Sequence, residues 1–228
     1  MADSKTYVKP KGNPSTLRLL AVIFWVIGIA CEVLGILFLL DIISVSNTIV
    51  FVVIALIVDL IFVVAGSLLW KRANKIDPPS EKNKVEFFIK TQLGAIIAVL
   101  AFFPILLFLL TDKKMDKKSK TWVSILAGIC LLVAVGLSID WNPISSEDLA
   151  QMEVNAQNSD FGNGNVKWSK NSKVYHTWDE CSALGRISAD NLRSGTVKDA
   201  FEDGKVRMCK FCAGHFGITE GVDTGNSE

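Results

Sequence analysis

Apolar residues are concentrated in four blocks within the first 140 residues, and the chain that follows them is polar. A hydrocarbon core about 30 Å thick requires roughly 20 helical residues, and a helix satisfies its own backbone hydrogen bonds in lipid. Each block has about this length, so the pattern predicts four transmembrane helices within residues 18–140, with a kink at Pro104 in the third. The blocks are residues 19–40, 49–70, 93–110 and 122–139.

The polar part of the chain has the local signals of a small mixed domain. Residues 166–176 alternate around a turn, which predicts a β-hairpin. Thr196 and Asp199 have the spacing of a capping box, which predicts a short helix before Gly204. Ser145 is an N-cap candidate for another short helix. The expected segments are a basic arm at 1–17, a linker at 141–165, the domain at 166–216 and a disordered tail at 217–228.

Lysine and arginine residues are distributed unevenly over the segments between the blocks. The N-terminal arm contains four of them, the first loop none, the second loop six and the third loop five. Because short cytoplasmic loops carry the excess of positive charge, two cytoplasmic termini place ten such residues inside and five outside. A re-entrant third block would instead place the C-terminal domain outside. We expect a multi-pass protein of the cell membrane with its N-terminus and its C-terminal domain in the cytoplasm.

Four potential metal ligands lie in the polar part of the chain. His176, Cys181, Cys209 and Cys212 form the pattern Y-H-x4-C-x27-C-x2-C. One imidazole and three thiolates have the number and softness of a closed tetrahedral zinc site, and a domain of about 50 residues needs such a constraint to stay folded. We therefore expect a structural Zn²⁺. The alternatives are a Cys209–Cys212 disulfide or redox pair, a different metal, or His215 as the histidine ligand.

The same residues carry a family resemblance. The run VYHTWDECSAL…SGTVKDAFEDGKVRMCKFC resembles a small bacterial domain found at the ends of secreted and membrane proteins. It is similar in outline to the β-ribbon metal-binding module of bacterial alkylated-DNA repair proteins, over about residues 166–213. This resemblance implies a zinc ribbon with His176, Cys181, Cys209 and Cys212 as ligands. His176 stands where that module has a cysteine, and the methyltransferase domain is absent, so repair activity is not implied.

The membrane half resembles bacterial four-span membrane proteins. The expected fold class is thus a membrane all-α protein, with a four-helix transmembrane bundle followed by a small α+β zinc-ribbon domain. Net charge adds one restriction: residues 141–228 contain 9 Lys and Arg against 13 Asp and Glu. Because nucleic-acid binding requires clustered positive charge, an acidic domain argues against a nucleic-acid partner.

Two acidic residues interrupt the apolar blocks. Glu32 and Asp59 lie eight and ten residues from the first loop, so an antiparallel helix pair places them at similar depth. A carboxylate in a membrane is costly and marks a functional candidate, here an ion or proton site. The structural alternative is a pair of neutral acids that hydrogen-bond to each other or to a neighbouring helix. We prefer the structural reading, because transporters usually show more polar residues and broken helices.

The chain lacks the motifs of common catalytic sites. It has no G-x-S-x-G, no H-E-x-x-H and no phosphate-binding loop, and it contains only two histidines. A site with four protein ligands leaves no position for a substrate. We expect a non-enzymatic protein embedded in the lipid bilayer, with a scaffold or interaction role and a protein partner at its C-terminal domain. The rival functions are a small transporter that uses Glu32 and Asp59 with a metal-sensing domain, and a thiol oxidoreductase.

Overall fold

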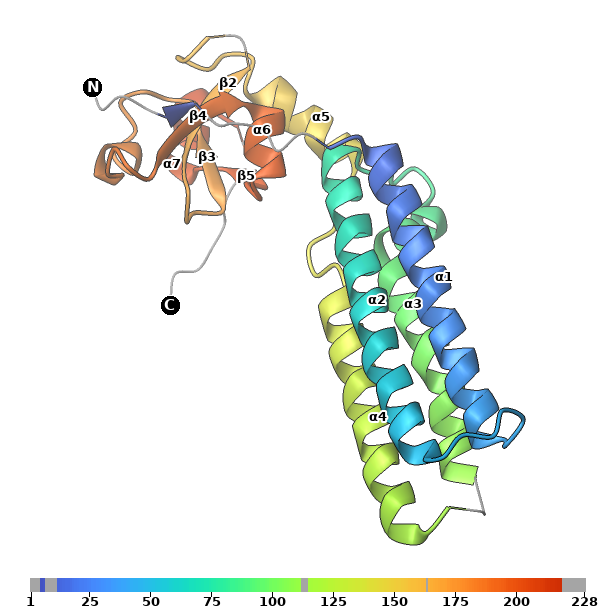
Figure 1. Ribbon diagram of the computed structural model, residues 1–228. Helices are drawn as coiled ribbons and strands as arrows, with labels where there is room; N and C mark the ends of the chain where they lie inside the picture. Colours follow the sequence, from blue (N-terminus) through green and yellow to red (C-terminus); the bar gives the residue numbers. More distant parts are fainter. Residues whose placement is uncertain (1–4, 7–11, 112–114, 163, 219–228) are drawn as a thin grey trace. The chain divides into compact units, whose positions relative to one another are not determined.

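The chain divides into two compact units, whose elements are labelled in Figure 1. One is a bundle of four long helices formed by Gly12–Asp77 and Lys82–Pro143. The other is a small domain around a mixed sheet, which contains residues 5–6, 78–81 and the described residues from 144 onward. The computed structural model describes residues 5–6, 12–111, 115–162 and 164–218.

The helices of the bundle confirm the four helices predicted from the apolar blocks. Each is long and apolar enough to cross a membrane, which is consistent with a multi-pass membrane protein. They exceed the apolar blocks because charged residues such as Arg72 and Glu86 continue the helical hydrogen bonding at the ends. The third helix includes Pro104 within a continuous span. The helices are α1 Pro14–Leu39, α2 Thr48–Ile76, α3 Lys84–Thr111 and α4 Lys117–Ser138.

Small residues allow α1 and α2 to pack closely. A Cβ atom at Gly66 would lie 2.7 Å from the Trp25 ring, and one at Gly28 would lie 3.0 Å from Val63. The Trp25 indole N–H donates to the carbonyl oxygen of Val63 at 3.3 Å. Helices in membranes associate through such close contacts, because the surrounding lipid is as apolar as their own side chains.

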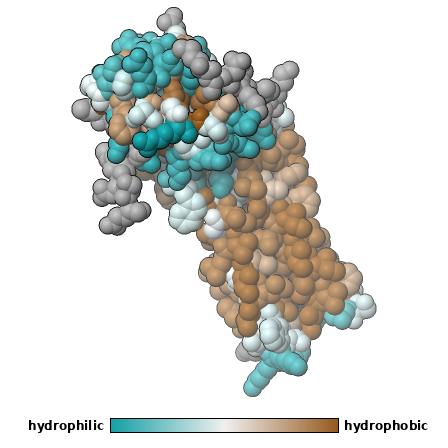
Figure 2. Space-filling model, turned by 90° about the vertical axis from the view of Figure 1, so that its left-hand side faces the viewer, coloured by the Kyte–Doolittle hydropathy of each residue, from teal (hydrophilic) through white to brown (hydrophobic). Residues whose placement is uncertain are grey.

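Large apolar side chains cover the outside of the bundle, which is brown along its length in Figure 2. Leu132 and Trp122, for example, are 74% and 66% exposed. An extended apolar surface of this kind is rare on soluble monomers. The exterior of the bundle therefore has the character of a lipid-facing surface.

The domain contains a five-stranded sheet with the order β1-β4-β2-β3-β5. β2 pairs antiparallel with both β3 and β4, so the predicted hairpin is confirmed. The outer pairs, β1 with β4 and β3 with β5, are parallel. The strands are β1 Lys5–Thr6, β2 Asn165–Ser169, β3 Val174–His176, β4 Leu192–Thr196 and β5 Arg207–Met208.

Three short helices accompany the sheet: α5 Ser146–Asn155, α6 Val197–Glu202 and α7 Lys210–Phe216. Ser145 caps α5 and Thr196 caps α6, and each forms a capping box with the aspartate three residues later. Both predicted N-caps are therefore confirmed. Gly204, at φ 82°, follows α6 in the left-handed conformation that favours glycine.

The domain is larger than the sequence predicted. The sequence predicted a linker at 141–165, but from Ile144 onward this segment belongs to the domain. Leu149, Met152 and Ala156, on and beside α5, are buried in the domain core. The N-terminal arm contributes β1 and then the start of α1 at Pro14, so it is more than a basic arm. Of the disordered tail expected at 217–228, residues 219–228 lie outside the described part of the chain.

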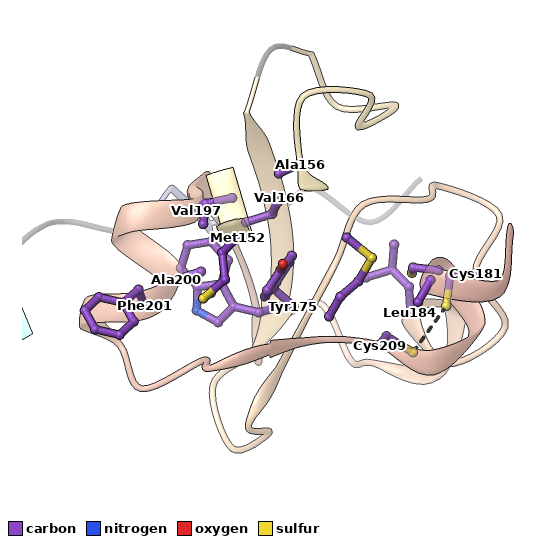
Figure 3. Close-up of a cluster of buried hydrophobic side chains, with 14 of the residues drawn as sticks. Met152, Ala156, Val166, Tyr175, Cys181, Leu184, Val197, Ala200, Phe201 and Cys209 are labelled. Carbon is purple, nitrogen blue, oxygen red and sulfur yellow. Dashed lines mark hydrogen bonds between the residues drawn. The ribbon is translucent and has the colours of Figure 1, made fainter. Parts of the chain in front are cut away.

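The core of the domain forms on one face of β2 and β3 and under α5 and α6 (Figure 3). Trp168 is fully buried, and its indole N–H donates to Asp203 Oδ2 at 2.8 Å. A Cβ at Gly195 on the neighbouring strand would lie 3.1 Å from the Trp168 ring. The core thus fixes the sheet from which the candidate ligands project.

Candidate metal centre

The four ligands predicted from the sequence lie at the ends of β3 and β5 and in the segments that follow these two strands. His176 ends β3, Cys209 follows β5, and Cys212 lies in the first turn of α7. Tyr175 pairs with Met208 in the parallel β3–β5 ladder, so the next residue of each strand reaches the same edge of the sheet. Cys181 enters from the loop after β3.

The ligand atoms of these residues all lie within 4.8 Å of one another. Cys181 Sγ and Cys212 Sγ lie 3.4 and 3.7 Å from His176 Nδ1, and Cys181 Sγ lies 4.0 Å from Cys209 Sγ. The dashed line in Figure 3 marks this last contact. In a tetrahedral zinc site, bond lengths of about 2.3 Å to sulfur and about 2.0 Å to nitrogen separate two sulfurs by about 3.8 Å and sulfur from nitrogen by about 3.5 Å. The residues therefore fit a metal ion of this size.

Hydrogen bonds within the cluster stabilise a thiolate at Cys209. A hydrogen bond from the Cys212 thiol, followed by His176 and the backbone N–H of Phe211, lowers the pKa of Cys209 well below its usual range. The same hydrogen bond, followed by burial, raises the pKa of Cys212, although the N–H groups of Trp178 and Thr177 point toward its sulfur. A metal ion would take the place of the shared proton, which is the usual competition at thiolate sites.

The cluster is closed to solvent. The exposed fractions are 2% for His176 and Cys181, 5% for Cys209 and 0% for Cys212. All five cysteines of the chain are free thiols, so the Cys209–Cys212 disulfide considered for this pair is not formed in this structure. Reactive redox cysteines need an accessible sulfur. The geometry favours metal binding over thiol exchange.

His215, the other candidate for the histidine ligand, lies outside the cluster. It is exposed and stacks on Trp178 with ring centroids 4.2 Å apart and an angle of 4° between the planes. His176 is the histidine that joins the three cysteines. Cys209 is the N-cap residue of α7 and Cys212 belongs to the first turn of that helix, so the C-x2-C pair lies at a helix N-terminus.

Residues that the sequence did not single out hold the Cys181 loop in place. The backbone N–H of Asp160 donates to Thr177 O at 2.9 Å, and the Asp160 carboxylate accepts the N–H of Asp179 at 3.0 Å. Ser159 Oγ donates to the same Thr177 oxygen at 3.2 Å. Asp160 had only the character of a turn residue in the sequence, which gives no signal of a contact nineteen residues away.

The two acidic residues within the apolar blocks are both buried in the bundle but have different surroundings. Glu32 on α1 is 5% exposed, and its Oε1 accepts the backbone N–H of Ile105 on α3 at 3.3 Å. Asp59 on α2 is fully buried, and neither of its oxygens has a hydrogen-bond partner in the part of the chain that the structure describes. The structural reading therefore accounts for Glu32 but leaves Asp59 unexplained.

Comparison of this chain with protein-family models, curated proteins and solved structures gave no match. The functional conclusions therefore depend on the geometry of the site. Taken together, four helices able to span a membrane and a buried His/Cys cluster fit a membrane protein with a metal-binding domain.

Proposed function

We propose that this chain is a non-enzymatic integral membrane protein whose C-terminal domain is folded around one structural zinc ion and serves as an interaction module. The observation that carries the proposal is the convergence of His176, Cys181, Cys209 and Cys212, all buried, within 4.8 Å. Zinc is the metal that best matches three thiolates and one imidazole in a closed tetrahedral set. Such a set fills the coordination sphere, which suits folding rather than catalysis.

The chain segments that make up the domain support a cytoplasmic location for the metal site. Strand β1 precedes the first helix, residues 78–81 lie between the second and third, and the rest of the domain follows the fourth. Parts of one folded unit must lie on one side of a membrane, so the helices must cross in pairs, α1 with α2 and α3 with α4. The N-terminal arm and second loop carry ten Lys and Arg, which favours the cytoplasm for that side. The reducing cytosol keeps thiols available to a metal.

The residues between and beside the ligands support an interaction role. Phe211 lies between Cys209 and Cys212 and is 49% exposed. The stacked rings of Trp178 and His215 flank the same ligand segments. The metal would hold these aromatic groups in a fixed arrangement, and exposed aromatic side chains are frequent anchors for protein partners. The partner class is therefore a protein with an apolar contact surface.

The resemblance to a β-ribbon module supports zinc as the metal and bacteria as the source of the chain. A second candidate function, ion-coupled transport with a metal-sensing domain, is favoured by the unpartnered carboxylate of Asp59 alone.

The decisive experiment is metal analysis of the full-length protein purified in detergent. We expect one zinc per chain. When a chelator removes the zinc, the domain should unfold, which amide hydrogen exchange would detect. A metal-free domain that is equally protected from exchange with and without chelator would contradict the structural role.

A further inference from the structure

The least satisfied polar group of the bundle is the carboxyl group of Asp59. It is fully buried, and both oxygens lack a hydrogen-bond partner within the described residues. Gly28 on α1 leaves space for the Asp59 carboxyl group, because a Cβ at position 28 would lie 2.8 Å from Asp59 Oδ1. The close α1–α2 packing therefore accommodates this carboxyl group at a specific place.

An ionised carboxylate in this position would be very unfavourable. Burial of an unpaired charge costs several kcal/mol or more, unless a counter-charge or hydrogen-bond donors compensate. The four apolar blocks contain no Lys, Arg or His to supply a positive charge. Something outside the described side chains must neutralise Asp59.

Few titratable groups surround Asp59. Glu32 and Cys31 on α1 and Cys130 on α4 lie within electrostatic range of it. From α3, residues 93–110 contribute no titratable side chain. Glu32 is the other carboxyl group among them, and a negative charge on it would add to the cost of a charged Asp59.

The available oxygen ligands are too few for calcium or magnesium but suffice for a proton. Calcium and magnesium require six or more oxygen ligands, whereas this place offers two carboxyl groups. One oxygen of Glu32 is already occupied by the N–H of Ile105. A proton needs a single carboxylate oxygen, which Asp59 supplies.

We propose that Asp59 and Glu32 form an intramembrane proton site, in which Asp59 binds one exchangeable proton and Glu32 holds the α3 backbone beside Pro104. The step is the reversible addition of a proton to the Asp59 carboxylate, which leaves a neutral carboxylic acid. Release of the proton leaves a negative charge on Asp59, so the charge state of the α1–α2 interface changes with proton occupancy.

The test uses the full-length protein in lipid vesicles and the apolar reagent N,N′-dicyclohexylcarbodiimide. A protonated carboxylic acid adds across a C=N bond of this reagent, its proton moves to nitrogen, and the product rearranges to an N-acylurea that contains all atoms of both reactants. Mass spectrometry of peptides then identifies the modified residue. We expect the adduct at Asp59, with a rate that falls about tenfold per pH unit above the midpoint of protonation.

The chain contains controls for this experiment. Glu86 on α3 is paired with Lys90 at the exposed end of its helix and should not react. Asp59→Asn should abolish the adduct, and a water-soluble carbodiimide should not reach Asp59. Gly28→Ala should lower the rate, because the added methyl group would occupy the space of the carboxyl oxygen. No adduct at Asp59 in the wild-type protein, or an adduct rate that does not vary with pH, would overturn the proposal.

Discussion

The backbone N–H of Cys209 donates to the carbonyl oxygen of Tyr175 at 2.9 Å, which extends the parallel β3–β5 pairing to the candidate metal ligands. Because of this hydrogen bond, His176 and Cys209 arrive at the same sheet edge although 32 residues of chain separate them. β5 is a two-residue strand at the edge of the sheet. Such a short pairing is weak by itself, so a metal that joins the two strand ends would stabilise it.

The two histidines of the chain provide a matched test of the ligand assignment. His176→Asn should lower the zinc content from about one per chain toward zero and unfold the domain, because a three-cysteine site loses its fourth ligand and much of its affinity. His215→Asn should retain the metal, since His215 is exposed and stacked on Trp178. Zinc content and chelator resistance of both variants are the measurements. Equal loss of zinc in the two variants would show that the ligand set is different.

Gly195 and Trp168 allow a test of the domain core. Gly195→Ala should destabilise the domain by about 1–3 kcal/mol, because the new methyl group would lie 3.1 Å from a fully buried indole ring. Gly185→Ala is the control, since nothing lies within 4 Å of a Cβ at that position. Denaturant unfolding monitored by tryptophan fluorescence measures both. If the variants had the same stability, the close contact on Trp168 would be wrong.

Glu147 should make the attachment of residues 78–81 to α5 depend on pH. Its carboxylate accepts hydrogen bonds from Ser80 Oγ at 2.5 Å and from the N–H of Glu81 at 2.9 Å, and they lower the pKa of Glu147 to about 2. A lowered pKa stabilises the folded state above the ordinary carboxyl range, and this contribution is lost as the pH falls from about 4.5 toward about 2.

Glu147→Gln should therefore speed amide exchange at Glu81 by the same factor at any pH above about 5, and the difference from wild type should shrink below it. Glu153→Gln, on the exposed face of the same helix, is the control. A difference that grows in acid would have the wrong sign for a lowered pKa.

The sequence was most informative where a local pattern determines the structure. Apolar length predicted the four helices, and the spacing of Thr196 and Asp199 predicted the cap of α6, because both depend on interactions within a few residues. The Cys and His residues that converge in the candidate metal centre were identified for a related reason. Soft donors at metal-ligand spacing are informative without knowledge of the fold that joins them.

Long-range pairing was not predictable in this way. β1 is two residues long and finds its partner β4 almost 190 residues later, and no pattern in the N-terminal arm specifies that register. The core role of α5 was missed because its buried apolar residues, Leu149 and Met152, are few and lie in a polar stretch. The lack of a partner for Asp59 depends on the packing of three other helices and has no signature in sequence.

The side of the membrane that the domain occupies can be read with two introduced cysteines. Asn158→Cys places an exposed thiol in the domain, and Ser44→Cys places one in the loop between α1 and α2. Residues 78–81 and the domain belong to one unit, so if α1 and α2 each cross the membrane, the first loop lies on the side opposite that unit. On intact cells, an impermeant maleimide should label Ser44→Cys and should label Asn158→Cys only after permeabilisation. The opposite result would place the domain outside, and labelling of both variants on intact cells would show that α1 and α2 do not separate these segments by a membrane.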